Sequence, residues 1–195
     1  GAVFRPYAIR IACGTATLCT ETYQLPKNST GQTPHGGLKG LDMVVWDVLA
    51  ADDSTLVLTY IHPDGQDGMP GNLEIVMTYT LTSDDEFKVS YLARTDKATP
   101  VNISHHSFFN LRGEGNGTIN EHVLHINASK TTPVDRVLIP TGEIADVTGT
   151  PFDFRVAKAI GTDLDAENEQ LRNGGGYDHN WILDRQSPDG LELAA

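Results

Sequence analysis

A pair of histidines, His105 and His106, lies in the segment PVNISHHSFFNL (100–111) and offers the first candidates for chemistry. If this segment forms a strand, its side chains alternate between two faces, so Asn102, Ser104 and His106 share a polar face opposite the mainly apolar face of His105. A polar stripe in an otherwise apolar sheet must face water, a partner or a ligand. Because imidazole titrates near neutral pH, His106 is a candidate general acid or base. A hydrogen-bonded structural histidine is the alternative.

Two further segments carry groups that could bind a sugar. In TPHGGLKGLDMVVW (33–46), His35 precedes two glycines, where the backbone can approach a ligand closely; a histidine in a surface turn is the alternative. In GGGYDHNWIL (174–183), Asp178 lies among tyrosine, histidine and tryptophan. A carboxylate accepts hydrogen bonds from hydroxyl groups, and aromatic faces cover the C–H side of a pyranose. The alternative for this segment is a capped turn with aromatic core residues.

Composition argues against several other functions. The net charge of −12 disfavours a nucleic-acid partner, and no apolar run approaches the ~20 residues of a membrane span. The loop HPDGQDGMPGN (62–72) lacks calcium-loop spacing, and no motif for a metal or a cofactor is present. Cys13 and Cys19 are too few for a disulfide framework, although a hairpin could bring them into one bridge.

The pattern along the chain predicts strands. Segments rich in Val, Ile, Thr and Tyr, separated by Gly, Pro and Asp turns, lie at 44–48, 55–61, 73–81, 87–95, 101–109 and 122–127. Segments 73–81 and 87–95 predict a hairpin over the loop 82–86, and only 156–160 and 163–171 indicate helix. Short strands at regular spacing predict an all-β fold, an antiparallel β-sandwich forming one domain over residues 1–195.

Together these motifs resemble the aldose 1-epimerase (galactose mutarotase) family. The segments that carry the resemblance are HGGLKGLD (35–42), PDGQDGMPGNL (63–73), PVNISHHSFFNL (100–111), TPVDRVLIPTGEI (132–144), GTPFDF (149–154) and GGGYDHNWIL (174–183). They occur in the family's order and cover nearly the whole chain. The resemblance implies a large antiparallel β-sandwich with an open cleft. It also implies interconversion of the α and β anomers of free aldoses such as glucose or galactose, with no cofactor.

The resemblance also assigns roles to residues. His106 matches the family's general acid, and His35 matches its second active-site histidine. Arg10 resembles the family's substrate-binding arginine, and Asp178 matches its substrate-binding aspartate, which accepts hydrogen bonds from ring hydroxyl groups. The implied chemistry protonates the ring oxygen and deprotonates the C1 hydroxyl, so that the ring opens, C1 turns about the C1–C2 bond, and the ring closes on the other face.

The sequence departs from the family pattern at several positions. Ile9 and His105 each stand where asparagine is usual, and Gln66 and Asp67 replace the more common pair of glutamates. The family's base is a glutamate near the C-terminus, beyond a further run of strands, and Glu192 does not match it. The sandwich is therefore expected to be truncated at both ends, and a further segment or chain is expected to complete it; a partial copy that keeps the centre of the fold without turnover is the alternative.

Two alternatives follow from these departures. A non-catalytic carbohydrate-binding module on the same fold would need no base. An epimerase-like protein acting on sugar phosphates would need clustered arginine or lysine, and the 14 basic residues do not cluster along the sequence. The cytoplasm is the favoured compartment. A secreted or periplasmic location is the alternative, because the sequence begins with Gly1 and its own N-terminus is expected to be missing.

Overall fold

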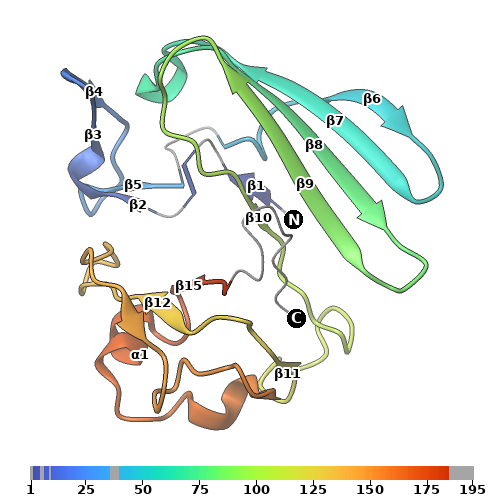
Figure 1. Cartoon of the computed structure of the whole chain (residues 1–195), viewed down its shortest axis with the longest axis vertical. Coiled ribbons are helices and arrows are strands. Elements are labelled where there is room, and N and C mark those ends of the chain that lie inside the picture. Colours follow the sequence, from blue (N-terminus) through green and yellow to red (C-terminus); the bar gives the residue numbers. More distant parts are fainter. Residues whose placement is uncertain (1, 5–6, 9, 36–39, 185–195) are drawn as a thin grey trace. The chain divides into compact units, whose positions relative to one another are not determined.

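The computed structural model describes residues 2–4, 7–8, 10–35 and 40–184. The chain divides into two compact units, Gly1–Phe108 and Phe109–Ala195, which are described separately. In the described residues all strand ladders are antiparallel and only one short α-helix occurs, which confirms the predicted all-β antiparallel class (Figure 1).

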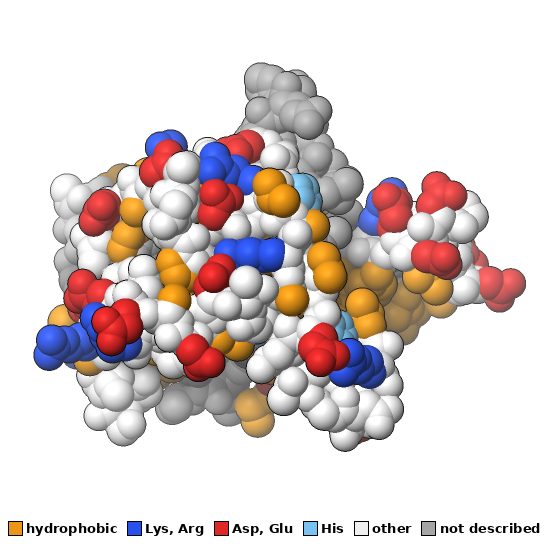
Figure 2. Space-filling model, turned by 90° about the horizontal axis from the view of Figure 1, so that it is seen from below, with side chains coloured by type: hydrophobic (Ala, Val, Ile, Leu, Met, Phe, Trp, Pro, Cys, Tyr) orange, Lys and Arg blue, Asp and Glu red, His pale blue; other side chains and the backbone are white. Residues whose placement is uncertain are grey.

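Carboxylates are scattered over the face seen in Figure 2, with apolar side chains between them, in keeping with the acidic composition.

A four-stranded sheet dominates the first unit. It consists of β6 (Asp47–Ala51), β7 (Thr55–His62), β8 (Leu73–Leu81) and β9 (Phe87–Thr95), in that order (Figure 1). The predicted hairpin is confirmed: Leu81 pairs with Phe87, and the Thr82 N–H donates to the Glu86 carbonyl at 2.9 Å. The strand predicted at 44–48 begins later, and a bulge lies between Val48 and Ala50.

The core of this unit follows the alternation of β8. Leu73, Ile75 and Met77 point to one face and are buried, with Leu41 and Val3 in the same cluster. Partly buried side chains from the neighbouring segments pack against it: Val44, Trp46, Leu58, Tyr60, Tyr79, Val89, Tyr91 and Ile103. Burial of side chains of this size stabilises a fold by about 1.5–3 kcal/mol each, so this sheet is the platform that holds the segments around it.

Three two-stranded ladders complete the first unit. They are β1 (Ala2–Phe4) with β10 (Ser104–His106), β2 (Arg10–Ile11) with β5 (Thr33–Pro34), and β3 (Thr15–Leu18) with β4 (Glu21–Gln24). The strand predicted at 101–109 is therefore only three residues long, because only those residues find ladder partners. Cys13 and Cys19 lie beyond opposite ends of β3 and are both free, so the bridge considered from the sequence is absent.

The second unit is built around aromatic side chains. Its ladders are β11 (Val123–Leu124) with β14 (Lys158–Ala159), and β12 (Lys130–Thr132) between β13 (Ala145–Asp146) and β15 (Asn180–Ile182). The helix indicated at 156–160 does not form. Its residues include the strand β14, which is followed by a 3-10 turn, Ile160–Asp163. The indication at 163–171 is met only by the start of α1 (Glu169–Gly174). None of the helices in the described part of the chain is long and apolar enough to cross a membrane.

Candidate functional site

The imidazole rings of His35 and His106 lie against each other in the first unit. Their centroids are 5.7 Å apart and the rings meet edge to face at 78°. His106 ends β10, where its backbone pairs with Ala2 of β1, and His35 directly follows β5. Both side chains are half-buried. Two of the residues predicted to act on a sugar are thus brought together from segments far apart in the sequence.

His105 points to the other face of β10, as the predicted alternation requires. Its ring packs against Tyr79 at 5.6 Å and Phe87 at 5.8 Å between centroids, and its Nε2 lies 3.2 Å from the Ser107 hydroxyl oxygen. Burial lowers the pKa of His105, and the charge of neighbouring His106 lowers it further. His105 is therefore neutral at neutral pH and anchors β10, which fixes the opposite orientation for His106.

An exposed aromatic ring extends this site. The Phe108 ring lies 4.9 Å from the His106 ring and is 89% exposed. The contact with the His106 ring distinguishes Phe108 from the other exposed apolar side chains, and an aromatic face can cover the C–H side of a pyranose. The alternation from 102 to 108 already places Phe108 on the face of His106, but the sequence alone gave no reason to assign it a binding role.

A strand pair places the backbone of Arg10 beside the segment that carries His35. Arg10 lies opposite Pro34 in the ladder of β2 and β5, one residue from His35. Thr33, in the same strand, is fully buried, and its hydroxyl donates to the Pro26 carbonyl at 2.6 Å. Buried Thr33 therefore anchors the segment that carries His35, and the strand paired with this segment carries Arg10.

The backbone of His35 is strained. Its φ is 46°, in the left-handed region, which costs a non-glycine residue about 1–2 kcal/mol. Strained backbone persists where surrounding structure fixes it, and it is often found at functional sites. The ladder of β2 and β5, together with buried Thr33, supplies that constraint here.

Asp178 lies in the second unit and is exposed. The aromatic residues around it, however, are core residues, which is the alternative that the sequence left open. The Tyr177 hydroxyl donates to the Pro151 carbonyl, and the Trp181 ring N–H donates to the Phe152 carbonyl. Asp178 remains a candidate for binding sugar hydroxyls, without an aromatic platform made of its neighbours.

The other neighbour of Asp178, His179, is tied to a glutamine. Its Nε2 lies 3.0 Å from the Gln170 Oε1, which also accepts from the Val134 N–H, so the proton of the imidazole is on Nε2. The Nδ1 is buried with no hydrogen-bond partner among the described residues. Burial lowers the pKa of His179, and the Asp178 carboxylate partly opposes this.

This environment predicts a dependence of stability on pH. The unfolded histidine titrates near pH ~6.5, and the folded pKa of His179 is lower, so its contribution is present above pH ~6.5 and is lost as the pH falls below it. Urea unfolding followed by tryptophan fluorescence at pH 7.5 and 5.5 is expected to show a smaller acid-induced loss in His179→Gln than in the wild type. Exposed His125, replaced by Gln, is the matched control. Equal losses in the wild type and His179→Gln would contradict the prediction.

The loop of residues 62–72 is organised by internal contacts. Asp64 pairs with Lys97 at 2.5 Å and accepts from the Gly71 N–H at 2.6 Å, and these contacts, the lysine first, lower the pKa of Asp64. The side chain of His62 is 1% exposed, and its Nε2 lies 3.6 Å from the Asp67 carboxylate. The described residues contain no group of three or more potential ligands arranged to hold a metal ion. The loop is therefore held by contacts among its own residues and Lys97.

Comparisons with known proteins place the chain in a family. The sequence model of the aldose 1-epimerase family matches residues 1–193. Galactose mutarotase of Sus scrofa is 42% identical over 185 residues, which are 95% of this chain and 52% of that protein. Aldose 1-epimerase of Escherichia coli (strain K12) is 37% identical over 195 residues, which are 100% of this chain and 56% of that protein.

A solved structure extends the likeness to the fold. Galactose 1-epimerase from Lactobacillus acidophilus NCFM superimposes with a TM-score of 0.82 at 34% identity, over 99% of this chain and 57% of that one. The predicted mutarotase-like fold is thereby confirmed. The chain spans about half the length of the curated relatives it matches.

Proposed function

The chain belongs to the aldose 1-epimerase family, and from this premise we propose that the protein interconverts the α and β anomers of free aldoses such as galactose and glucose. The observation that carries the proposal is the pair of imidazoles, His35 and His106, in contact beside the exposed ring of Phe108. Imidazole exchanges protons near neutral pH, and the apolar ring offers a surface for a sugar.

In the proposed reaction, His106 donates a proton to the ring oxygen while a base removes the proton of the C1 hydroxyl. The C1–O5 bond breaks and the C1 carbonyl forms. After rotation about C1–C2, the O5 hydroxyl attacks the other face of C1, and both protons return to their sources. We assign His35 to contact the sugar near the reacting centre, and Arg10 and Asp178 to hold its hydroxyl groups.

We further propose that another segment or chain completes the sandwich and supplies the base. All five residues of β6 are exposed, including Val48 and Leu49, and β6 is an edge of its sheet. An exposed apolar edge strand is a template for further strand pairing. Intact-mass spectrometry of the protein from its source is expected to show a chain longer than the 21.1 kDa of this sequence, or a second chain. A single species of that mass alone would contradict the proposal.

Polarimetry of freshly dissolved α-galactose tests the function. The rate constant of mutarotation is expected to rise in proportion to the concentration of the intact protein. A rate equal to that of buffer would contradict the proposal. Saturable sugar binding without acceleration would instead identify a carbohydrate-binding module.

We assign the protein to the cytoplasm on the state of its thiols. Cys13 and Cys19 are both free and exposed, which fits a reducing compartment better than an oxidising one. Recovery of the protein in the secreted or periplasmic fraction of source cells would contradict this assignment.

A further inference from the structure

A hollow of about 370 Å³ in the second unit is lined by Arg136, Glu169, Arg172 and Asn173. Arg136 comes from the loop between β12 and β13, and the other three residues come from α1. The basic residues do not cluster along the sequence, but the fold brings these two distant arginines to one hollow. The proposed reaction uses neither of them.

The loop that carries Arg136 is fastened to α1. The side chain of Gln170 accepts from the Val134 N–H at 2.7 Å and donates to the Val134 carbonyl at 3.1 Å. Asn173 donates to the same carbonyl at 2.9 Å, and Val134 is itself buried. Since Gln170 and Asn173 flank Arg172 on the helix, these bonds fix the start of the Arg136 loop against the turn that carries Arg172.

The loop is also closed on itself. The Asp135 carboxylate accepts from the N–H groups of Val137 and Ile139, each at 2.9 Å, and the Asp135 N–H donates to the Ile139 carbonyl at 2.9 Å. The Thr141 N–H donates to the Pro133 carbonyl at 3.0 Å. Arg136 therefore projects from a backbone that is ordered before any ligand arrives.

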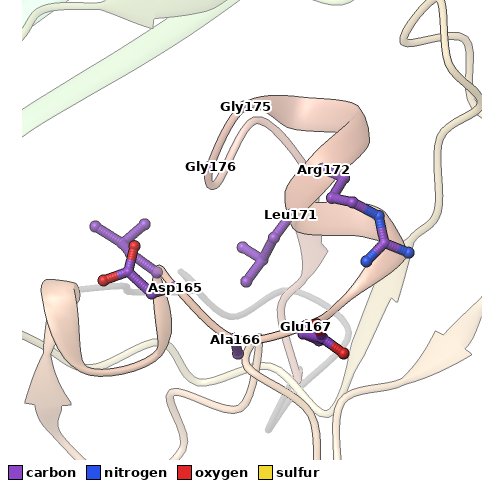
Figure 3. Close-up of a pocket in the computed structure, with 8 residues that line it drawn as sticks. Asp165, Ala166, Glu167, Leu171, Arg172, Gly175 and Gly176 are labelled. Atoms are coloured by element: carbon purple, nitrogen blue, oxygen red, sulfur yellow. The ribbon is translucent and has the colours of Figure 1, made fainter.

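The helix α1, which forms the other side of the hollow, is also held in a fixed position. The Asn168 side chain caps α1 by accepting from the N–H groups of Gln170 and Leu171, and Gly175, with φ of 63°, ends the helix. Leu171 is buried in the core, and the Arg172 side chain extends on the other side of Leu171 from Asp165 (Figure 3). Arg172 also lines a second hollow, the one drawn in Figure 3. The acidic residues that line this second hollow are Asp165 and Glu167.

In the hollow that Arg136 and Arg172 line, the charges do not cancel. Both arginines are exposed, and neither forms an ion pair with another described residue. Arginine stays charged at any physiological pH, and its planar fork of N–H groups fits the oxygens of phosphate in pairs. Glu169 contributes one negative charge to the same wall, so the lining has a net charge of +1 in a chain of −12.

We propose that Arg136 and Arg172 form a binding site for a phosphate group, either as inorganic phosphate or as the phosphate of a phosphorylated sugar. The two guanidinium groups donate to its oxygens, and the amide of Asn173 is within the same wall. Glu169 weakens the site by repelling the anion. This inference does not rest on the proposed reaction, since binding requires no interconversion of anomers.

Titration calorimetry with inorganic phosphate at low salt tests the site. Saturable binding is expected, and Arg136→Gln and Arg172→Gln are each expected to weaken it about tenfold, the usual size for loss of a charge-assisted hydrogen bond. Glu169→Gln is expected to tighten it severalfold, because the repulsion is removed. Arg94→Gln is the matched control, since Arg94 is an exposed arginine of the other unit that forms no ion pair with a described carboxylate, although Glu74 lies opposite it on β8.

Weaker phosphate binding in the two arginine variants, together with tighter binding in Glu169→Gln, would distinguish a specific site from general attraction of phosphate to positive charge. Absence of saturable binding, or an equal loss in Arg94→Gln and Arg136→Gln, would overturn the proposal. So would unchanged affinity in Glu169→Gln. Circular dichroism of each variant checks that the fold is retained. Tighter binding of glucose 6-phosphate than of inorganic phosphate would identify a sugar phosphate as the ligand, and equal binding would identify phosphate itself.

Discussion

Replacing His106 by Asn is expected to slow the interconversion of anomers about 10²–10⁴-fold, the range typical for loss of a general acid. Asparagine preserves a hydrogen-bonding side chain but cannot give up a proton at neutral pH. The affinity for the sugar should change little, because Arg10 and Asp178 are assigned to hold it. Polarimetry of fresh α-galactose with equal amounts of wild type and variant measures the rates.

His105→Asn is the matched control for this experiment. It removes an imidazole from the adjacent position, where the ring packs against Tyr79 and Phe87 on the other face of β10. Its effect on the rate, measured on folded protein, is expected to stay below tenfold. A wild-type rate in His106→Asn would remove that residue from the reaction. Equal losses in both variants would show that the strand, and not the proton of His106, matters.

Gly68→Ala is expected to destabilise the first unit by about 2–5 kcal/mol. The φ of Gly68 is 78°, and an added Cβ would lie 2.3 Å from the carbonyl oxygen of Gln24 and 3.3 Å from the Leu25 side chain. The obstructing atom belongs to the backbone of β4, so relief requires moving the chain itself. Urea unfolding of the wild type and variant measures the difference in the free energy of unfolding.

Gly65→Ala is the control that isolates the steric part. Gly65 has the same φ of 78°, in the same loop, but nothing lies within 4 Å of an added Cβ. Only the left-handed backbone then opposes alanine, at about 1–2 kcal/mol. If both variants lose the same stability, the packing of this loop on β4 is not as described.

The long strands could be predicted from the sequence because one local pattern determines them. In LEIVMTYTL and FKVSYLART apolar and polar residues alternate, and the turn residues between them set the register. The segment 101–109 has a similar pattern, yet only Ser104–His106 form a strand. Its length is set by the three residues of β1 that pair with it, and a partner strand is a non-local property.

The same distinction applies to the sites. Alternation alone placed His106 opposite His105, and the glycines after His35 indicated an approachable turn. The contact of His35 with His106 depends on tertiary packing, as does the role of Phe108. The hollow of Arg136 and Arg172 could not be predicted, because it requires the hydrogen bonds between Gln170 and Val134. Those bonds join segments with no shared sequence pattern.

Titration of galactose into the chain labelled with ¹⁵N, followed through its imidazole resonances, tests the central claim most directly. The resonances of His35 and His106 are expected to shift together and to give one dissociation constant, while those of exposed His125 stay in place. If neither of the paired imidazoles responds, or if the two titrate at different sugar concentrations, they do not line a common sugar site.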